Sequence, residues 1–169
     1  SACLVGSEMC IRDRNVSFVA YDLNSNSPLA SKGYGFIMRR VLDGTDTADT
    51  LFAGDNYEYI LGGLGDDLIT GSDRSDALLG GDGNDTLTGG AGNDELDGGA
   101  GSANVAIFSG KASDYSVTWN GTVYQGLSMT IVDSVSGRDG IDTLSNVQIL
   151  RFNDGDLVLD AESNESNYI

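Results

Sequence analysis

Apolar side chains recur at a fixed interval of nine residues through the middle of the chain. From residue 44 to residue 106 the sequence divides into seven units of nine, without an insertion. The eighth position of every unit is apolar: Leu51, Ile60, Ile69, Leu78, Leu87, Leu96 and Val105. The three residues around it form a short strand that points its middle side chain to one face. One unit cannot bury that side chain alone, so the units are predicted to stack into a β-solenoid.

The other part of each unit is a glycine-rich turn. Gly occupies position one in every unit except the second, where Ala53 stands, and it recurs at positions two and four. Glycine accepts a positive φ without a Cβ clash, so the chain can reverse within six residues. Two units then make one coil, with odd-numbered units on one side and even-numbered units on the other. We call the two resulting columns of turns the odd edge and the even edge.

Position six is acidic in six of the seven units. These residues are Asp49, Glu58, Asp67, Asp76, Asp85 and Asp94. Stacking places the sixth positions of units two apart roughly 5 Å from each other, the distance between neighbouring strands. Like charges at that distance repel unless a cation lies between them. The pattern therefore predicts paired carboxylates along each edge, with cations between them.

The pairs follow from the numbering of the units. On the odd edge Asp49 is predicted to pair with Asp67, and Asp67 with Asp85. Asp85 would then meet Ala103, the sixth position of the last unit, which leaves half a site.

On the even edge Glu58 is predicted to pair with Asp76, and Asp76 with Asp94. Two departures weaken this edge. Glu58 is one methylene longer than Asp and follows an atypical turn. Arg74 puts a positive charge at position four of the fourth unit, where most units have Gly.

Glycine turns leave backbone carbonyl groups free to point into the same gaps, so they are predicted to contribute ligands as well. The glycines concerned are Gly62, Gly63, Gly65, Gly80, Gly81, Gly83, Gly89, Gly90, Gly92, Gly98, Gly99 and Gly101. Carboxylates and carbonyls form an all-oxygen cage with six or more ligands. Such a cage suits Ca²⁺ better than Mg²⁺, which requires a tight octahedron, and better than zinc or copper. About four to five calcium ions are expected.

Composition supports a cation partner and excludes several other functions. The chain has 26 acidic and 9 basic residues, a formal net charge of −17. Nucleic acid binding requires a basic footprint that this sequence lacks. His is absent, which removes His-based catalytic triads and His-ligated zinc. No apolar run is long enough to span a membrane. The sequence predicts a monomer with no catalytic residues.

The regions outside the repeats are predicted to be one N-terminal flank, one capping segment and a tail. Residues 1–14 resemble a translated sequencing adaptor and are predicted to be a non-native scar. Residues 15–43 form the flank, with short strands predicted at 15–23 and 34–42. Residues 107–160 alternate in the manner of strands, with an Asn120-Gly121 hairpin turn, and are predicted to cap the last coil. Residues 161–169 form a polar tail.

The consensus of the units resembles the RTX, or haemolysin-type, calcium-binding nonapeptide repeat. Residues 108–110, 113–115 and 139–147 also resemble the segment after the repeats in serralysin-type proteases and other type I-secreted proteins. The resemblance covers residues 44–160. It implies an all-β fold, a right-handed parallel β-roll, with calcium bound in the turns and folding triggered by calcium outside the cell. It also implies attachment to an upstream effector or adhesin domain.

These observations predict a calcium-binding, calcium-triggered folding module of a larger secreted bacterial protein, non-catalytic by itself. One alternative is an adhesin-type repeat domain that binds polysaccharide or another surface, suggested by the strand residues Thr50, Thr70, Thr86 and Thr88. Another alternative is an enzyme that uses carboxylates alone, as glycosidases do. Regular repetition of the carboxylates favours ligands over a single catalytic pair.

Overall fold

The structure is a computed structural model that describes residues 16–17, 40–54, 58–120, 128–159 and 167–168. These residues form β-strands and one 3-10 helix, η1 (Ala112–Asp114). No helix among them is long and apolar enough to cross a membrane. The predicted all-β class is confirmed.

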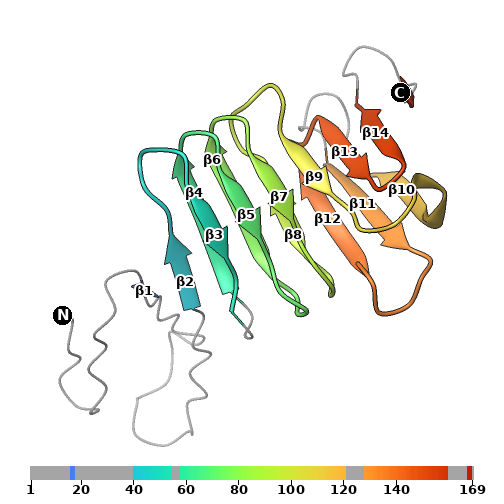
Figure 1. Cartoon of the computed structure of the whole chain (residues 1–169), viewed down its shortest axis with the longest axis horizontal. Helices are drawn as coiled ribbons and strands as arrows, with labels where there is room; N and C mark the ends of the chain where they lie inside the picture. The colour runs from blue at the N-terminus through green and yellow to red at the C-terminus, as the bar shows by residue number, and fades with distance from the viewer. Residues whose placement is uncertain (1–15, 18–39, 55–57, 121–127, 160–166, 169) are drawn as a thin grey trace, which may run out of the picture.

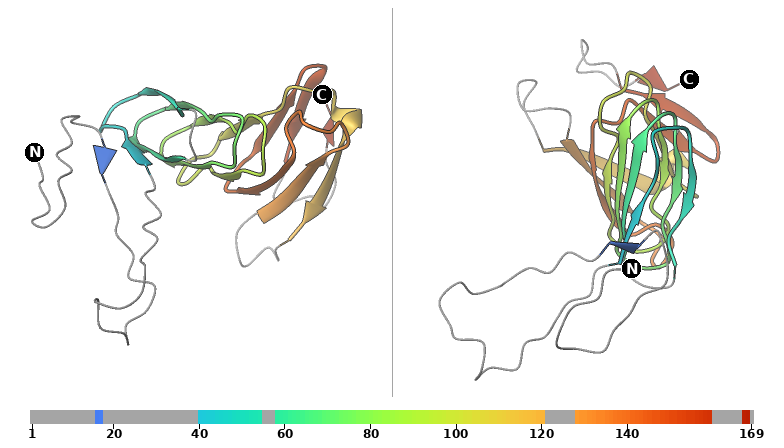
Figure 2. Two further views of the ribbon diagram at one scale, coloured as in Figure 1. Left: turned by 90° about the horizontal axis from the view of Figure 1, so that it is seen from below. Right: turned by 90° about the vertical axis from the view of Figure 1, so that its left-hand side faces the viewer.

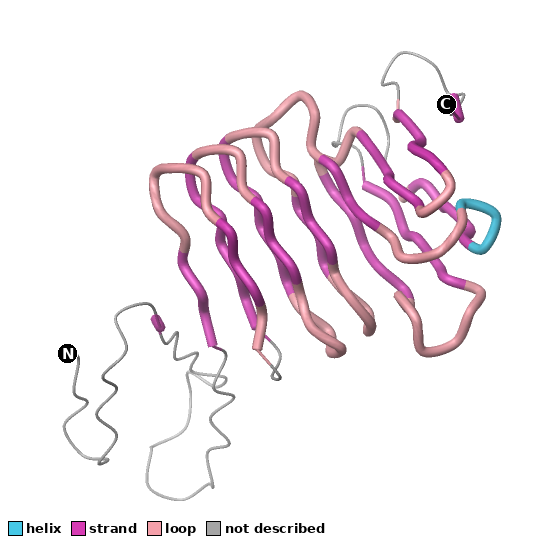
Figure 3. The backbone as a smooth tube through the Cα atoms, viewed as in Figure 1, coloured by secondary structure: helices cyan, strands magenta, loops and turns pink. Residues whose placement is uncertain are grey.

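The repeats form two parallel sheets that face each other, one from each half of the coils (Figures 1 and 2). Even-numbered units contribute β4 (Glu58–Leu64), β6 (Ala77–Asp82) and β8 (Glu95–Asp97), which follow β2 (Arg40–Asp43). Odd-numbered units contribute β3 (Thr50–Phe52), β5 (Leu68–Thr70), β7 (Thr86–Thr88) and β9 (Val105–Ile107). Successive strands along the chain are joined by turns that alternate between the two ends of the coil (Figure 3). This is the predicted parallel β-roll.

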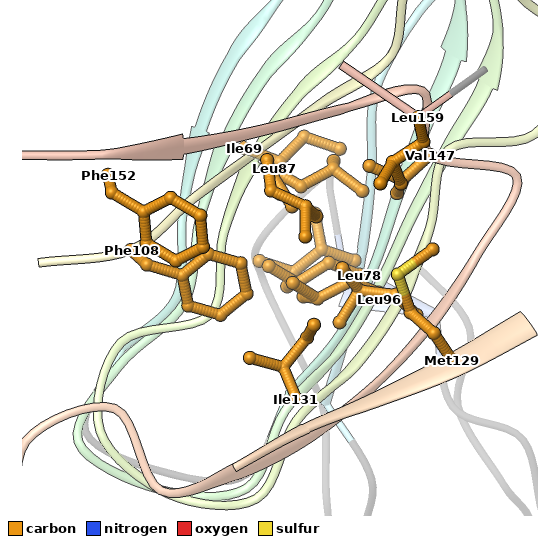
Figure 4. Packing of buried hydrophobic residues seen from close by; sticks show 14 residues of the cluster. Ile69, Leu78, Leu87, Leu96, Phe108, Met129, Ile131, Val147, Phe152 and Leu159 are labelled. Carbon is orange, nitrogen blue, oxygen red and sulfur yellow. The ribbon is translucent and has the colours of Figure 1, made fainter. Parts of the chain in front are cut away.

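The apolar eighth positions form the core between the two sheets. Ile60, Ile69, Leu78, Leu87 and Leu96 have no exposed surface. Figure 4 shows four of them packed beside the aromatic and aliphatic side chains that follow the repeats. Leu51, in the first coil, is only half-buried. Each fully buried Leu or Ile contributes about 1.5–3 kcal/mol, so this row supplies much of the stability of the coils.

The register changes by one residue at the seventh unit. Between earlier coils equivalent positions are 18 residues apart, so that Ile69 stands opposite Leu87. At the seventh unit Leu87 stands opposite Ala106, which is 19 residues further on. The seventh unit therefore contains an insertion of one residue, contrary to the uninterrupted period predicted from the sequence.

This insertion corrects two predictions for the seventh unit. Ala106 and not Val105 continues the row of eighth positions, although Val105 is also buried. Asn104 and not Ala103 occupies the sixth position, because its Oδ1 accepts a hydrogen bond from the backbone N–H of Asp85 at 2.8 Å. The prediction that Asp85 meets Ala103 is therefore wrong, because Asp85 meets Asn104, which also lacks a carboxylate.

The strands after the repeats extend both sheets of the roll. β12 (Ile141–Ser145) pairs in parallel with β8, and β13 (Ile149–Phe152) pairs in parallel with β9. Antiparallel strands follow on each side: β11 (Ser128–Asp133) and β10 (Tyr115–Trp119) beyond β12, and β14 (Gly155–Val158) beyond β13. β15 (Asn167–Tyr168) pairs with β14, and β1 (Val16–Ser17) pairs with β2. The described residues after the repeats thus share the two sheets of the coils.

An aromatic cluster lies between the sheets at the end of the roll that follows the repeats. The ring centroids of Phe108, Tyr115 and Phe152 lie 5.1–5.6 Å from one another. These distances are typical of favourable aromatic pairs. The cluster continues the aliphatic core of the coils past the last repeat.

Several predictions fall on residues outside the described ranges. The proposed N-terminal scar lies wholly outside them, and so does most of the predicted strands at 15–23 and 34–42. The turn after Asn120 lies outside them as well, although β10 and β11 pair in the antiparallel manner of a hairpin.

Candidate metal centre

Each sixth-position aspartate lies in a turn, directly before the strand that carries the apolar eighth position, whereas Glu58 is the first residue of β4. The parallel register of the strands stacks these turns one above another along each edge (Figure 3). The sixth position therefore recurs once per coil on each edge. This arrangement brings together residues that are 18 positions apart in the sequence.

A ladder of backbone-to-carboxylate hydrogen bonds connects the stacked turns. On the odd edge the N–H of Asp49 donates to Oδ1 of Asp67, and the N–H of Asp67 donates to Oδ1 of Asp85, both at 2.8 Å. On the even edge the N–H of Asp76 donates to Oδ1 of Asp94 at 2.9 Å. These three predicted pairs do lie together. The side chain of Glu58 lies outside the described residues, so its predicted pairing with Asp76 stays a prediction.

The second oxygen of three of these carboxylates is buried and has no hydrogen-bond donor among the described residues. The atoms are Oδ2 of Asp67, Asp85 and Asp94. Each of these residues is at most 3% exposed. A buried polar atom without a partner costs about 1–3 kcal/mol, and more when the group is charged. Such atoms in a native fold indicate a further partner, and for a carboxylate that partner is a donor or a cation.

The second oxygen has a donor in the two turns whose position two carries a hydroxyl. In the first and fourth units this position is Thr45 or Ser72. The backbone N–H and the hydroxyl of Thr45 both donate to Oδ2 of Asp49, and those of Ser72 both donate to Oδ2 of Asp76. Units with Gly at position two lack such a hydroxyl. The three carboxylates whose Oδ2 has no described donor all belong to Gly-Gly turns.

Glycine at position one forms the wall of each candidate site. A Cβ atom on Gly62 would lie 2.3 Å from Oδ2 of Asp67 and 2.3 Å from the carbonyl oxygen of Gly80 in the next coil. A Cβ on Gly80 or Gly89 would lie 2.2 Å from the Oδ2 of the Asp in the same unit. The carboxylate and the neighbouring carbonyl therefore face a space that only glycine leaves open.

The other predicted glycines shape the turns or lie beside the amide of Asn104. A Cβ on Gly98 or Gly101 would collide with the side chain of Asn104. These two glycines therefore face an amide and not a carboxylate. Most of the glycines at positions two and four have a positive φ, between 72° and 138°. They are Gly63, Gly65, Gly81, Gly83, Gly90, Gly92 and Gly99.

Burial makes the stacked carboxylates difficult to ionise without a cation. Burial raises the pKa of Asp67 and of Asp85, and it raises the pKa of Asp94 to about 7. The hydrogen bond from the backbone N–H one coil away lowers each pKa in part, and the neighbouring carboxylate raises it again. A cation in the adjacent space would oppose the effect of burial by favouring the charged form.

The donor set fits a hard cation that accepts many oxygen ligands. Among the described residues no group of three or more Asp, Glu, His or Cys side chains converges on one point. A cation in these turns would therefore take most of its ligands from backbone carbonyls such as that of Gly80. Calcium accepts such mixed carboxylate and carbonyl sets. Arg74 is exposed, so its charge lies at the surface of the fourth turn.

Sequence reasoning missed one carboxylate that belongs to the same ladder. Asp142, which is 2% exposed, accepts a hydrogen bond from the N–H of Asp94 through Oδ1 at 2.9 Å. Burial raises the pKa of Asp142 to about 8. A signal for it exists in the sequence, because Gly137, Gly140, Asp142 and Leu144 reproduce positions one, four, six and eight of the repeat.

Comparison with known proteins supports the same conclusion about the repeats. The sequence model of the RTX calcium-binding nonapeptide repeat (4 copies) matches residues 41–69 and 70–103. No curated protein matches the chain. The solved structure of the extracellular lipase LipA from Serratia marcescens is similar, with a TM-score of 0.54 and 22% sequence identity, over 64% of this chain and 18% of the lipase chain. At that identity the likeness shows the fold alone. Residues 41–103 of this chain therefore carry RTX calcium-binding nonapeptide repeats.

Proposed function

We propose that the chain is a calcium-binding module of a larger secreted bacterial protein and that it folds when it meets calcium. The observation that carries the proposal is the set of buried second oxygens on Asp67, Asp85 and Asp94, which have no donor among the described residues. Calcium supplies the further partner and neutralises the stacked charge. The module is non-catalytic by itself, and its sixth-position aspartates act as ligands with the carbonyl groups of the glycine turns.

The energetics of the proposal follow from linkage between binding and folding. A site at about ten times its Kd contributes roughly 1.4 kcal/mol to stability. About four to five such sites contribute roughly 6–7 kcal/mol, which is comparable to the whole stability of a small domain. Without calcium the same carboxylates oppose folding, because they are buried and repel one another. Folding is therefore expected to depend on calcium.

The place of the module in a longer protein also belongs to this proposal. RTX repeats are typical of extracellular proteins exported by type I secretion, and the similar lipase structure is also extracellular. The chain spans 18% of that lipase, which leaves room for a separate effector domain in a protein of similar organisation. The partner domain in this proposal is an upstream effector or adhesin.

Far-UV circular dichroism during a calcium titration tests the proposal, with magnesium as the control ion. We expect a cooperative gain of β signal between about 0.1 and 10 mM calcium and no gain with magnesium. A spectrum that is fully folded in chelator and unchanged by calcium would contradict calcium-triggered folding.

A second candidate, adhesion, rests on the outer face of the sheet built from odd-numbered units. Phe52 and Leu68 are 64% and 41% exposed there, and they lie in register with the threonines of β5 and β7. Exposed apolar side chains on a sheet are suited to contact with a surface. The apolar residues interrupt the threonine rows, so the described strands carry no regular threonine array. A glycan-binding assay on the calcium-loaded chain tests this candidate, and an absence of binding would remove it.

A further inference from the structure

A copy of the nonapeptide recurs after the repeats end. Residues 137–145 read GRDGIDTLS, with Gly at positions one and four, Asp at six and Leu at eight. The family match ends at residue 103, so this copy lies outside it. The eighth position, Leu144, is completely buried and stands opposite Leu96 of the sixth unit. The copy therefore continues the apolar core in phase with the repeats.

The structure stacks positions four to eight of this copy, residues 140–144, on the even edge after the sixth unit. Gly137, at position one, departs from the stack, because no described atom lies within 4 Å of its Cβ. The N–H of Thr143 donates to the carbonyl of Asp94 at 2.8 Å, and the N–H of Asp94 donates to Oδ1 of Asp142 at 2.9 Å. The same two kinds of contact join the sixth and fourth units, where the N–H of Glu95 donates to the carbonyl of Asp76. Gly140, at position four, lies directly against the carbonyl of Gly92 and has a φ of 83°.

The buried second oxygen of Asp94 lies beside Gly89, the glycine at position one of its own turn. A Cβ on Gly71 or Gly62 would point at the carbonyl of the glycine one coil further on, 2.0 or 2.3 Å away. A Cβ on Gly89 would lie 2.2 Å from Oδ2 of Asp94. This oxygen has no donor among the described residues, and Asp94 is 3% exposed. The coil that follows is the turn that contains Asp142.

We propose that a calcium ion binds between Asp94 and Asp142, so that the segment after the repeats supplies an acidic ligand to the even edge. This inference rests on the proposed calcium-binding function and adds a site that the repeats alone cannot complete. Asp94 contributes its Oδ2 and Asp142 contributes its carboxylate, with carbonyl groups of the two turns as further ligands. Calcium binding then joins the last even-numbered repeat to the segment that follows it.

The odd edge shows how the same position is built without a carboxylate. There Asn104 takes the sixth position, its Nδ2 donates to the carbonyl of Asn146 at 2.9 Å, and its N–H donates to Oε1 of Gln148 at 2.7 Å. Neutral amides therefore close the odd edge through hydrogen bonds. An Asn in place of Asp142 would keep one part of this arrangement, since Asn Oδ1 also accepts the N–H from the coil before.

The test is the number of calcium ions bound by the full chain, measured by isothermal titration calorimetry, before and after Asp142→Asn. We expect the variant to bind one ion fewer and to keep the affinity of the other sites. Asp156→Asn is the control, because Asp156 pairs with Arg151 at the surface, away from the turns. An unchanged count and affinity in Asp142→Asn, beside a normal chain that binds calcium, would overturn this site alone. Absence of calcium binding by the unchanged chain would overturn the proposed function as well.

A second variant keeps the test decisive if Asp142→Asn does not fold. Asp142→Glu retains the charge on a longer side chain, so it should keep the ion count and weaken one site by at least about tenfold. Wild-type affinity at every site in Asp142→Glu would also overturn the proposal.

Discussion

The odd and even edges of the roll are built from the same nonapeptide but end in different chemistry. After Asp85 the odd edge continues with Asn104, whose amide both accepts and donates a hydrogen bond. After Asp94 the even edge continues with Asp142, which brings a second buried carboxyl group. Hydrogen bonds therefore satisfy the polar groups in the last turn of the odd edge. In our proposal a cation does so in the last turn of the even edge.

The same difference occurs within single turns. Asp76 has its second oxygen bonded to Ser72, whereas Asp94, one coil further on, has no described donor to its second oxygen. In our proposal a hydroxyl at position two and a cation are two ways to satisfy a buried carboxylate. In our proposal the need for a cation therefore varies from turn to turn, and single substitutions are expected to change it.

The largest loss of stability is expected from Gly80→Ala on the odd edge and from Gly89→Ala on the even edge. The added Cβ would lie 2.2 Å from Oδ2 of Asp85 or Asp94 and would displace the carboxylate. Overpacking of this kind costs about 1–3 kcal/mol. Urea unfolding in saturating calcium measures the cost.

Gly137→Ala is the matched control, since no described atom lies within 4 Å of its Cβ and only its φ of 76° opposes the substitution. Equal losses in all three variants would contradict the role of the glycine wall.

The second-largest loss of stability is expected from Asn104→Asp, which makes the odd edge resemble the even edge. The change removes the amide donor to the carbonyl of Asn146 and adds a buried charge. Stability in chelator should fall by about 2 kcal/mol. Calcium should recover part of this loss, because the new carboxylate faces Asp85. Urea unfolding with and without calcium measures the difference, and an identical loss in both conditions would contradict the comparison.

These expectations depend on features that the sequence predicts unequally. The nine-residue period fixes which residues are buried and which aspartates meet, because side-chain phase and strand register follow from it. The shift at Asn104 has no local signal, since Val105 and Ala106 are both apolar and either could fill the eighth position. Asp142 meets Asp94 across 48 residues, and the intervening β10–β11 pair conceals the continued period.

A smaller effect is expected from Ser72→Ala, which removes one donor to Oδ2 of Asp76. The loss should be about 1 kcal/mol, the usual value for one hydrogen bond. Thr45→Ala is the comparison on the odd edge, where the same contact is exposed and its loss should cost less. Thermal unfolding in calcium measures both variants. A larger loss in Thr45→Ala would show that burial does not set the value of this contact.

The smallest change in stability is expected at Arg138, which forms ion pairs with Asp133 and Asp114 beside the last even-edge turn. Burial raises the pKa of Asp133, but the hydrogen bonds from Arg138 and from the backbone outweigh burial and hold that pKa below its usual value. A lowered pKa stabilises the fold above the unfolded pKa of about 3.9, and the contribution disappears as pH falls through the folded pKa. The stability difference between the normal chain and Arg138→Met should therefore narrow below about pH 4.

Denaturation in calcium from about pH 6 to about pH 3 measures that difference. Arg151→Met is the control, because the Arg151–Asp156 pair is exposed and contributes little. A difference that stays constant with pH would show that Arg138 acts through packing and not through its charge.

The most direct test of the central claim is a crystal structure of the full chain grown in calcium, with anomalous diffraction to locate the ions. The account predicts calcium within about 2.3–2.6 Å of Oδ2 of Asp67, Asp85 and Asp94. Water molecules or protonated carboxyl groups at these oxygens, with no calcium beside them, would contradict it.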